Sequence, residues 1–478
     1  MTLREQMLRR KAVPDAAQAT SDEQRGGLKR ALGAFDLTLL GIGAIIGAGI
    51  FVLTGVGAQQ AGPALTVSFT LAGVACAMAA LCYAEFSTMI PVAGSAYSYA
   101  YATLGELIGW IIGWDLVLEY AVGASAVAVG WSGYLARVMA GVGMPLASSL
   151  THAPGSVPGA VVNLPALLVV MVTSAVLYVG IRESARFNAL IVAVKLAAVA
   201  VVIVVGAWFV RPHNWVPFAP FGIKGISQGA AYIFFAYIGF DAVSTAAEEV
   251  VNPSRDLPIG IIGSLAVCTL LYILVAGVLT GMVPYPHIDR EAPLASAFVE
   301  RGLDLVAGLI SLGAVAGLTS VLLVLLLGQT RIFFAISRDG LLPAVFSRVH
   351  PRFRTPHIPT VITGIAVGAA AALIPIQEIA ELANIGTLFA FVLVCAGIWV
   401  LRVTSPEIAR PFRTPLVPFA PIVGMLFCAY LMASLPPITW IRFFLWMGIG
   451  LVIYFSYGRH HSRWVASEEQ AGVSVAAR

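Results

Sequence analysis

Apolar stretches long enough to cross a lipid bilayer recur along the whole chain, and they restrict its fold more than any other feature. A helix of about 20 residues spans roughly 30 Å of hydrocarbon, and a window of that length finds about twelve such stretches. The composition agrees, with 59% hydrophobic and 11% charged residues and a mean hydropathy of +0.90. We therefore expect an all-α integral membrane protein. The predicted spans are residues 35–57, 65–89, 103–133, 164–181, 187–210, 228–249, 258–283, 303–330, 358–375, 380–402, 416–434 and 438–457.

Basic residues between the spans predict the orientation of the chain. With the N-terminus inside, Lys and Arg in the cytoplasmic segments outnumber those on the other side by roughly three to one. The first apolar run begins too deep in the chain, and is too long, for a cleaved signal peptide. We therefore expect a multi-pass protein of the cell membrane (the inner or plasma membrane) with both termini in the cytoplasm.

Two of the spans contain glycine near the depth of the bilayer midplane. The first carries Gly47-Ala48-Gly49, and the sixth carries Gly239 followed closely by Asp241. Paired interruptions of this kind, at corresponding positions of two halves, are typical of secondary transporters with a binding site of unwound backbone. Spans one to five and six to ten overlay as two units of roughly 190 residues, and an odd number of spans per unit inverts the second unit. The expected organisation is a tail at 1–34, a first repeat at 35–210, a loop and second repeat at 211–402, two further spans at 403–457 and a tail at 458–478.

An interrupted helix leaves backbone groups without partners, and these groups suggest the ligand. N–H groups are freed where the second half begins, and carbonyls are freed where the first half ends. If residues 46–50 unwind, their amides can hold a carboxylate, while carbonyls near residues 235–238 can accept from an ammonium. Such a site suits an α-amino acid. The alternative is that these glycines serve only helix packing, a pattern that Gly43 and Gly47 also fit; the costly intramembrane Asp241 favours a functional site.

Longer motifs carry a family resemblance over nearly the whole chain. They are GIGAIIGAGIF at 41–51, YAEF at 83–86 with Pro91, FAYIGFD at 235–241, and EE at 248–249 followed by NP at 252–253. These motifs resemble the amino acid–polyamine–organocation superfamily, most closely its bacterial cationic amino acid transporter branch. The resemblance implies a LeuT-type five-plus-five inverted repeat with two extra helices, alternating access, and an amino acid bound between the first and sixth helices.

The resemblance also assigns roles to matching positions. It places Ile46, Gly47, Ala48 and Gly49 against the substrate carboxylate, and Phe235, Ala236 and Ile238 against the ammonium. Many relatives have serine or threonine where this chain has Ala48, so a hydroxyl contact to the carboxylate is missing here and the backbone alone would bind it.

Lys195 lies in the middle of the fifth span, and it is the only lysine inside a span. Apolar surroundings disfavour its charged form, so it can exchange a proton. The resemblance places it where sodium-coupled relatives hold sodium, against the carbonyls of Gly43 and Ile46 and near Thr319 and Ser320. We therefore predict proton coupling at Lys195. The alternatives are a permanently charged tether to those carbonyls and a side chain that reaches the interface.

Carboxylates and aromatic residues add further candidates. Asp115 and Glu119 stand four residues apart and share one helix face; for Asp115 we expect hydrogen bonds to neighbouring helices. Glu119 and Asp241 are candidates for reading a cationic side chain or for relaying protons. Phe235 and Phe240, beside the interruption, are candidate substrate contacts.

Other classes of protein fit less well. The basic residues form no single face for nucleic acid, and the five cysteines lie inside apolar stretches without metal spacing. All seven histidines fall in predicted loops or tails, so we expect neither a cofactor nor an enzyme. Scattered ionisable groups argue against a channel. An amino acid permease, coupled to protons, is therefore predicted, and an exchanger or a transport-inactive sensor with the same site stays open. The sequence leaves open which L-amino acid binds, the oligomeric state and any small membrane partner.

Overall fold

The computed structural model describes residues 32–89, 95–180, 185–245, 247, 250–353 and 355–462, together with Met7. Most of both predicted tails, as well as Pro91 and residues 248–249, lie outside the described residues. Within them the chain is helical, and its only β-type pairings are two isolated bridges, Leu32 with Val250 and Thr151 with Asn163.

Each of the twelve predicted spans contains at least one helix, and the boundaries agree to within several residues. The principal helices are α3 (Ala34–Ile45), η1 (Gly49–Leu53), α4 (Thr54–Ala61), α5 (Leu65–Met89), α6 (Ser95–Thr103), α7 (Glu106–Gly141), α8 (Ser148–Thr151), α9 (Leu164–Val179), α10 (Ala185–Ala207), α11 (Gly222–Ile233), η4 (Phe234–Tyr237), α12 (Ala242–Thr245), α13 (Pro253–Met282), α14 (Pro293–Val299), α15 (Asp304–Arg338), α16 (His357–Leu373), α17 (Ile376–Thr404), α18 (Phe419–Ala433), α19 (Pro437–Ile453), η8 (Tyr454–Gly458) and α20 (Arg459–His461). The sequence did not predict α6 and α14, because both are short and lie between the apolar stretches.

Seven of the described helical segments are long and apolar enough to cross a membrane, and four apolar helices are shorter, with 10–17 residues. Two of the predicted spans fall short because they are interrupted: α3 has 12 residues, and so does α11. The protein is therefore a multi-pass membrane protein, while the count of twelve crossings and the inverted repeat stay predictions.

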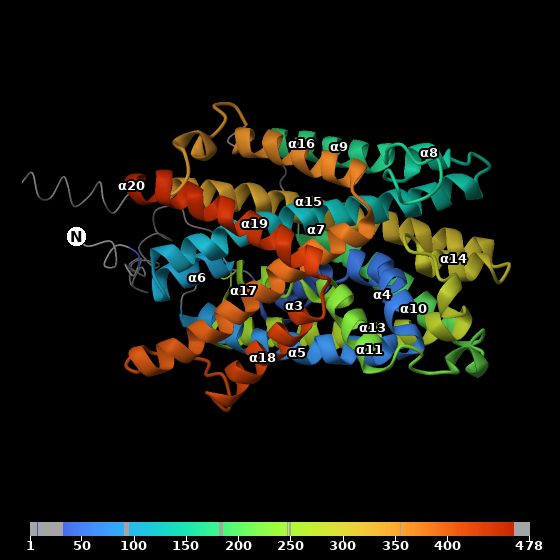
Figure 1. Ribbon diagram of the computed structural model, residues 1–478, viewed down its shortest axis with the longest axis horizontal. Helices are drawn as coiled ribbons and strands as arrows, with labels where there is room; N and C mark the ends of the chain where they lie inside the picture. The colour runs from blue at the N-terminus through green and yellow to red at the C-terminus, as the bar shows by residue number, and fades with distance from the viewer. Residues whose placement is uncertain are drawn as a thin grey trace, which may run out of the picture.

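The helices pack so that the interrupted segments lie inside the molecule. Figure 1 shows α6 and α20 at one end and α8 and α14 at the other, with α3 between them. The helix α13 packs against α3 and α5, and α15 packs against α7 and α10. Every residue of η1 is buried, so the first interruption is enclosed by protein, where irregular backbone can be tolerated at membrane depth.

A buried ion-pair cluster lies where α5 and α17 end. Glu85, at the end of α5, is fully buried. Both of its carboxylate oxygens accept hydrogen bonds from Arg402 at 2.9 Å, and Arg410 lies 3.1 Å from one of them. The amide of Thr414 also donates to this carboxylate, at 2.8 Å. Glu85 therefore ties α5 to the end of α17 and to the loop that follows it.

A second ionic cluster lies at the opposite end, in the loop before α14. Arg137 donates to Asp289 at 2.8 Å, and the Glu291 carboxylate lies 3.6 Å from the His152 ring. Burial, together with the negative charge of Asp289, raises the pKa of Glu291 to about 8. This loop therefore carries a carboxyl group that titrates near neutral pH.

Candidate functional site

The first interruption separates backbone groups that a continuous helix would pair. The helix α3 ends at Ile45, Ile46 has an extended backbone (φ −72°, ψ 94°), and the chain becomes helical again at η1. In an unbroken helix the amide of Gly47 would bond to the carbonyl of Gly43, four residues earlier. Among the described residues, the amides of Gly47, Ala48 and Gly49 donate no hydrogen bond. Three neighbouring N–H groups are thus available to an acceptor.

Lys195 donates a hydrogen bond to a carbonyl that the interruption leaves without its helical partner. Its Nζ atom donates to the Gly43 carbonyl at 2.8 Å, and the residue is only 1% exposed. The aliphatic part of the side chain lies on Gly317 of α15, where an added Cβ would come within 2.8 Å of Lys195 Cγ. The side chain therefore joins α10 to the interrupted α3 and to α15.

The other predicted partners of Lys195 are placed differently. The Thr319 hydroxyl donates to the Val315 carbonyl at 2.7 Å and accepts from the Trp131 indole at 2.9 Å. Over the part of the chain that the structure describes, no hydrogen bond links Lys195 to Ile46, Thr319 or Ser320. The structure thus brings together Lys195 and Gly43 from the predicted coupling group.

The second interruption depends on a glycine conformation and a local carboxylate. After the 3₁₀ turn η4, Ile238 is extended (ψ 137°) and Gly239 has φ 119°, a region that side chains disfavour. The Gly239 amide donates to Asp241 Oδ1 at 3.1 Å, and Asp241 is 4% exposed. The carboxylate predicted to face the substrate therefore helps to hold the break itself.

The two interruptions lie directly against each other. An added Cβ on Gly49 would come within 2.1 Å of the Ala236 Cα atom, and one on Gly239 would come within 2.9 Å of the Ala44 carbonyl oxygen. The Tyr272 hydroxyl, on α13, lies 2.8 Å from the Ile45 carbonyl and 2.9 Å from the Ala236 carbonyl. One hydroxyl thus bridges the two broken helices.

Asn384 of α17 replaces helical partners at the second break. Its Oδ1 atom accepts from the Phe235 amide at 2.6 Å, and its Nδ2 atom donates to the Tyr232 carbonyl at 2.8 Å. Neither Asn384 nor Tyr272 was predicted from the sequence. An amide side chain inside an apolar span was a usable signal for Asn384, whereas a tyrosine in a helix carries no comparable signal.

Two of the carbonyls predicted to bind an ammonium already face a hydrogen-bond donor. The Phe235 carbonyl accepts from the Ile238 amide at 3.1 Å, and the Ala236 carbonyl shares the single Tyr272 hydroxyl proton with the Ile45 carbonyl. A carbonyl oxygen has two lone pairs, so each can accept a second donor. An ammonium at this point would share these carbonyls rather than occupy them alone.

The carboxyl groups of α7 lie near α17, and Glu119 also lies near Asp241 at the second break. Glu119, 4% exposed, contacts the Thr387 hydroxyl and interacts electrostatically with Asp241. Asp115 is fully buried, and neither of its carboxylate oxygens has a hydrogen-bond partner among the described residues. The hydrogen bonds to neighbouring helices expected for Asp115 are therefore not found. Its carboxylate faces Gly386, which has no side chain that could donate a hydrogen bond.

The two phenylalanines beside the break pack in different surroundings. The Phe235 ring lies on Gly123 of α7, where an added Cβ would come within 2.9 Å of the ring. Phe240 is fully buried between Tyr83 at 5.5 Å and Phe391 at 5.2 Å, measured between ring centroids. Phe240 thus belongs to an aromatic cluster, and Phe235 lies closer to the interrupted backbone.

Comparison with known proteins gives consistent matches over most of the chain. A family model described as "Amino acid permease" matches residues 32–455. The chain is 52% identical to the methylthioribose transporter of Bacillus subtilis, over 91% of this chain and 95% of that protein. It is 51% identical to the branched-chain amino acid permease BcaP of the same organism, over 96% and 98%. It is 41% identical to the vacuolar cationic amino acid transporter 4 of Arabidopsis thaliana, over 84% and 68%.

Proposed function

The chain belongs to the amino acid permease family, and we propose that it is a secondary active permease of the cell membrane that carries an L-amino acid by alternating access. The observation that carries this proposal is the pair of interruptions packed against each other, beside amides of residues 47–49 that donate no hydrogen bond to any described residue. Broken helices that meet at mid-depth supply a site whose halves can move relative to each other. With an even number of crossings, both termini lie in the cytoplasm.

The chemistry of the site supports an amino acid over a sugar derivative. The relatives at 52% and 51% identity are named for methylthioribose and for branched-chain amino acids, so identity alone does not separate these substrates. Methylthioribose carries neither a carboxylate nor an ammonium. Three free backbone amides near a helix start favour a carboxylate, because charge-assisted hydrogen bonds to an anion are the strongest available to them.

We further propose that Lys195 couples transport to protons. A protonated amine has three N–H groups, and its described hydrogen bond is the one to the Gly43 carbonyl. Loss of the proton would weaken this bond, and with it the link between α10 and the interrupted α3. The protonation state of one side chain would thereby bias the position of a helix that contributes to the substrate site.

Uptake into proteoliposomes tests the proposal. We expect an inward proton gradient to drive accumulation of a tritiated amino acid. Lys195→Ala should abolish this gradient-driven uptake, while counterflow of labelled substrate persists. Lys224→Ala, at an exposed lysine in the first turn of α11, is the matched control and should behave as the native protein. Unchanged dependence on the gradient in Lys195→Ala contradicts proton coupling at this residue.

A competition panel separates the substrates and the alternatives. Leucine, arginine, alanine and methylthioribose are added in turn, together with an amino acid amide that lacks the carboxylate. We expect the amide to compete at least about tenfold more weakly than the parent amino acid, since it loses the charge-assisted bonds. Strict one-for-one exchange without net uptake would indicate an exchanger, and binding without counterflow would indicate a sensor.

A further inference from the structure

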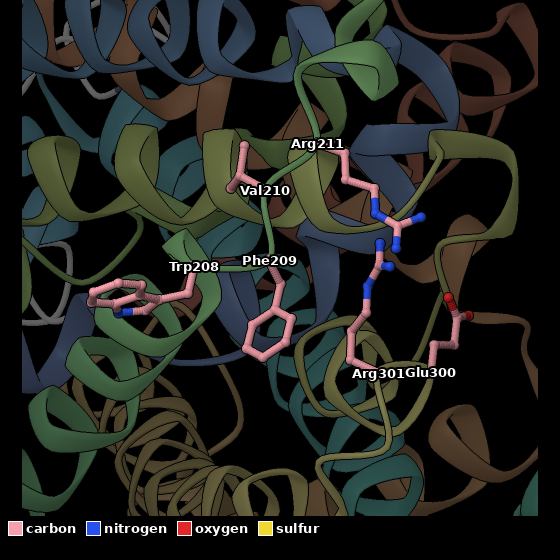
Figure 2. Close-up of a pocket in the computed structure, with 6 residues that line it drawn as sticks. All are labelled: Trp208, Phe209, Val210, Arg211, Glu300 and Arg301. Carbon is pink, nitrogen blue, oxygen red and sulfur yellow. The ribbon is translucent and has the colours of Figure 1, made fainter.

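A surface pocket of about 430 Å³ lies far from the interrupted helices, where α10 ends and α14 leads into α15. Its lining comes from two short segments, and Figure 2 shows all six side chains: Trp208, Phe209, Val210, Arg211, Glu300 and Arg301. Glu300 and Arg301 directly follow α14, which lies with α8 at one end of the molecule (Figure 1). None of these residues takes part in the site described above.

The pocket brings two positive charges together. The guanidinium groups of Arg211 and Arg301 point toward one another (Figure 2). Arg301 also donates to the Met282 carbonyl at the end of α13, but its Nε atom is buried and has no hydrogen-bond partner among the described residues. Over the same residues neither arginine forms an ion pair with a carboxylate, Glu300 included. Like charges at close range repel, so an anion between them would relieve the repulsion and satisfy the buried N–H.

Exposed apolar side chains in the pocket and in the helix that follows it along the chain indicate that it lies at the boundary of the membrane. Trp208, directly after α10, is 84% exposed, and Leu305, in the first turn of α15, is 78% exposed. Leu309, one turn further along α15, is 57% exposed. Tryptophan is enriched at membrane interfaces, and exposed leucines on a membrane helix face acyl chains. An anion bound here therefore has hydrocarbon immediately beside it.

We propose that this pocket binds the phosphate of an anionic glycerophospholipid, with Arg211 and Arg301 holding the phosphodiester and the acyl chains lying along Leu305 and Leu309. The planar fork of each arginine suits bidentate bonds to phosphate oxygens. The charges of two arginines and Glu300 add up to +1, which a phosphodiester with a neutral, hydroxyl-bearing headgroup cancels. The Glu300 carboxylate can accept hydrogen bonds from such hydroxyl groups, as in phosphatidylglycerol.

Lipid retention by the full-length protein tests this assignment. The protein is placed in bilayer discs of phosphatidylcholine with equal minor fractions of phosphatidylglycerol and phosphatidylethanolamine, and native mass spectrometry identifies the lipids that remain bound after release. We expect selective retention of phosphatidylglycerol. Replacing one arginine, as in Arg211→Gln, should lower its relative retention about fivefold, and the double variant with Arg301→Gln should lower it about 25-fold.

Matched controls make each outcome decisive. Lys224, which comes after the loop that follows Arg211, is exposed and does not line the pocket. Lys224→Gln removes this charge and should leave the retention of phosphatidylglycerol unchanged. If the double variant does not fold, Arg211→Gln and the native protein still give the preference between lipids. Equal retention of phosphatidylethanolamine and phosphatidylglycerol by the native protein would overturn the proposal. So would full displacement by millimolar inorganic phosphate, which would identify a site for a soluble anion. Amino acid counterflow, measured in parallel, reports on the proposed transport separately.

Discussion

Substituting Gly49 by alanine should separate the two interrupted helices. The new methyl carbon would lie 2.1 Å from the Ala236 Cα atom and 2.4 Å from its Cβ atom. Ordinary contacts begin at 3.4 Å, so the backbones must move apart by more than 1 Å, and no flexible side chain can absorb the shift. Overpacking of this kind costs about 1–3 kcal/mol. If the packed arrangement of the site is destabilised by that energy, the population of this arrangement falls roughly fivefold to 150-fold.

The assay is the initial rate of amino acid uptake in proteoliposomes, with thermal unfolding measured on the same preparations. Gly49→Ala should lower the uptake rate within that range. Gly308→Ala is the control, because α15 leaves open space around Gly308 and alanine favours a helix; this variant should transport normally. Normal uptake by Gly49→Ala with an unchanged KM would refute the inference that direct contact between the two breaks forms the site.

Three further perturbations address single contacts. Tyr272→Phe removes the hydroxyl that bridges the two breaks and should lower the uptake rate about tenfold. Tyr237→Phe loses a hydrogen bond to a carbonyl of α5 and should lower the uptake rate less. Equal effects of the two variants would contradict the bridge. Glu291 keeps its proton up to about pH 8 when folded but only to about 4.5 when unfolded, so the melting temperature should fall by a few degrees between these pH values. Glu291→Gln should make this fall smaller. An equal fall in the variant and the native protein would assign it to another group. Glu85→Gln leaves the buried Arg410 and the partly buried Arg402 uncompensated, and it should lower the free energy of unfolding by about 3 kcal/mol or more. Glu378→Gln, at a side chain that is 42% exposed, should change it by less than about 1 kcal/mol. Similar melting temperatures for the two variants would contradict a structural role for Glu85.

Local patterns in the sequence predicted the helices and the positions of the breaks. Apolar length marks each span, and the glycines around positions 47–49 and at 239 stand where the backbone leaves the helix. Contacts between distant segments could not be predicted in this way. Asp241 was assigned to the substrate site because a carboxylate inside the membrane is energetically costly. In the structure this carboxylate accepts a hydrogen bond from the Gly239 amide, two residues away. Asn384 lies 149 residues from the amide that it satisfies, and no pattern within one helix links such a pair.

The pattern of satisfied and unsatisfied groups at the breaks indicates what kind of ligand completes them. Other helices supply a donor for the carbonyls of Gly43 and Ile45, through Lys195 and Tyr272. At the second break, side-chain oxygens satisfy the amides of Phe235 and Gly239. The amides of residues 47–49 donate no hydrogen bond in the described structure. A ligand that brings an acceptor to this point would satisfy these amides, and a carboxylate would bring the strongest one. Because buried donors without partners are costly, binding of the proposed carboxylate would stabilise the packed arrangement of the two breaks. Occupancy would then be linked to conformation, as the proposed alternating access requires.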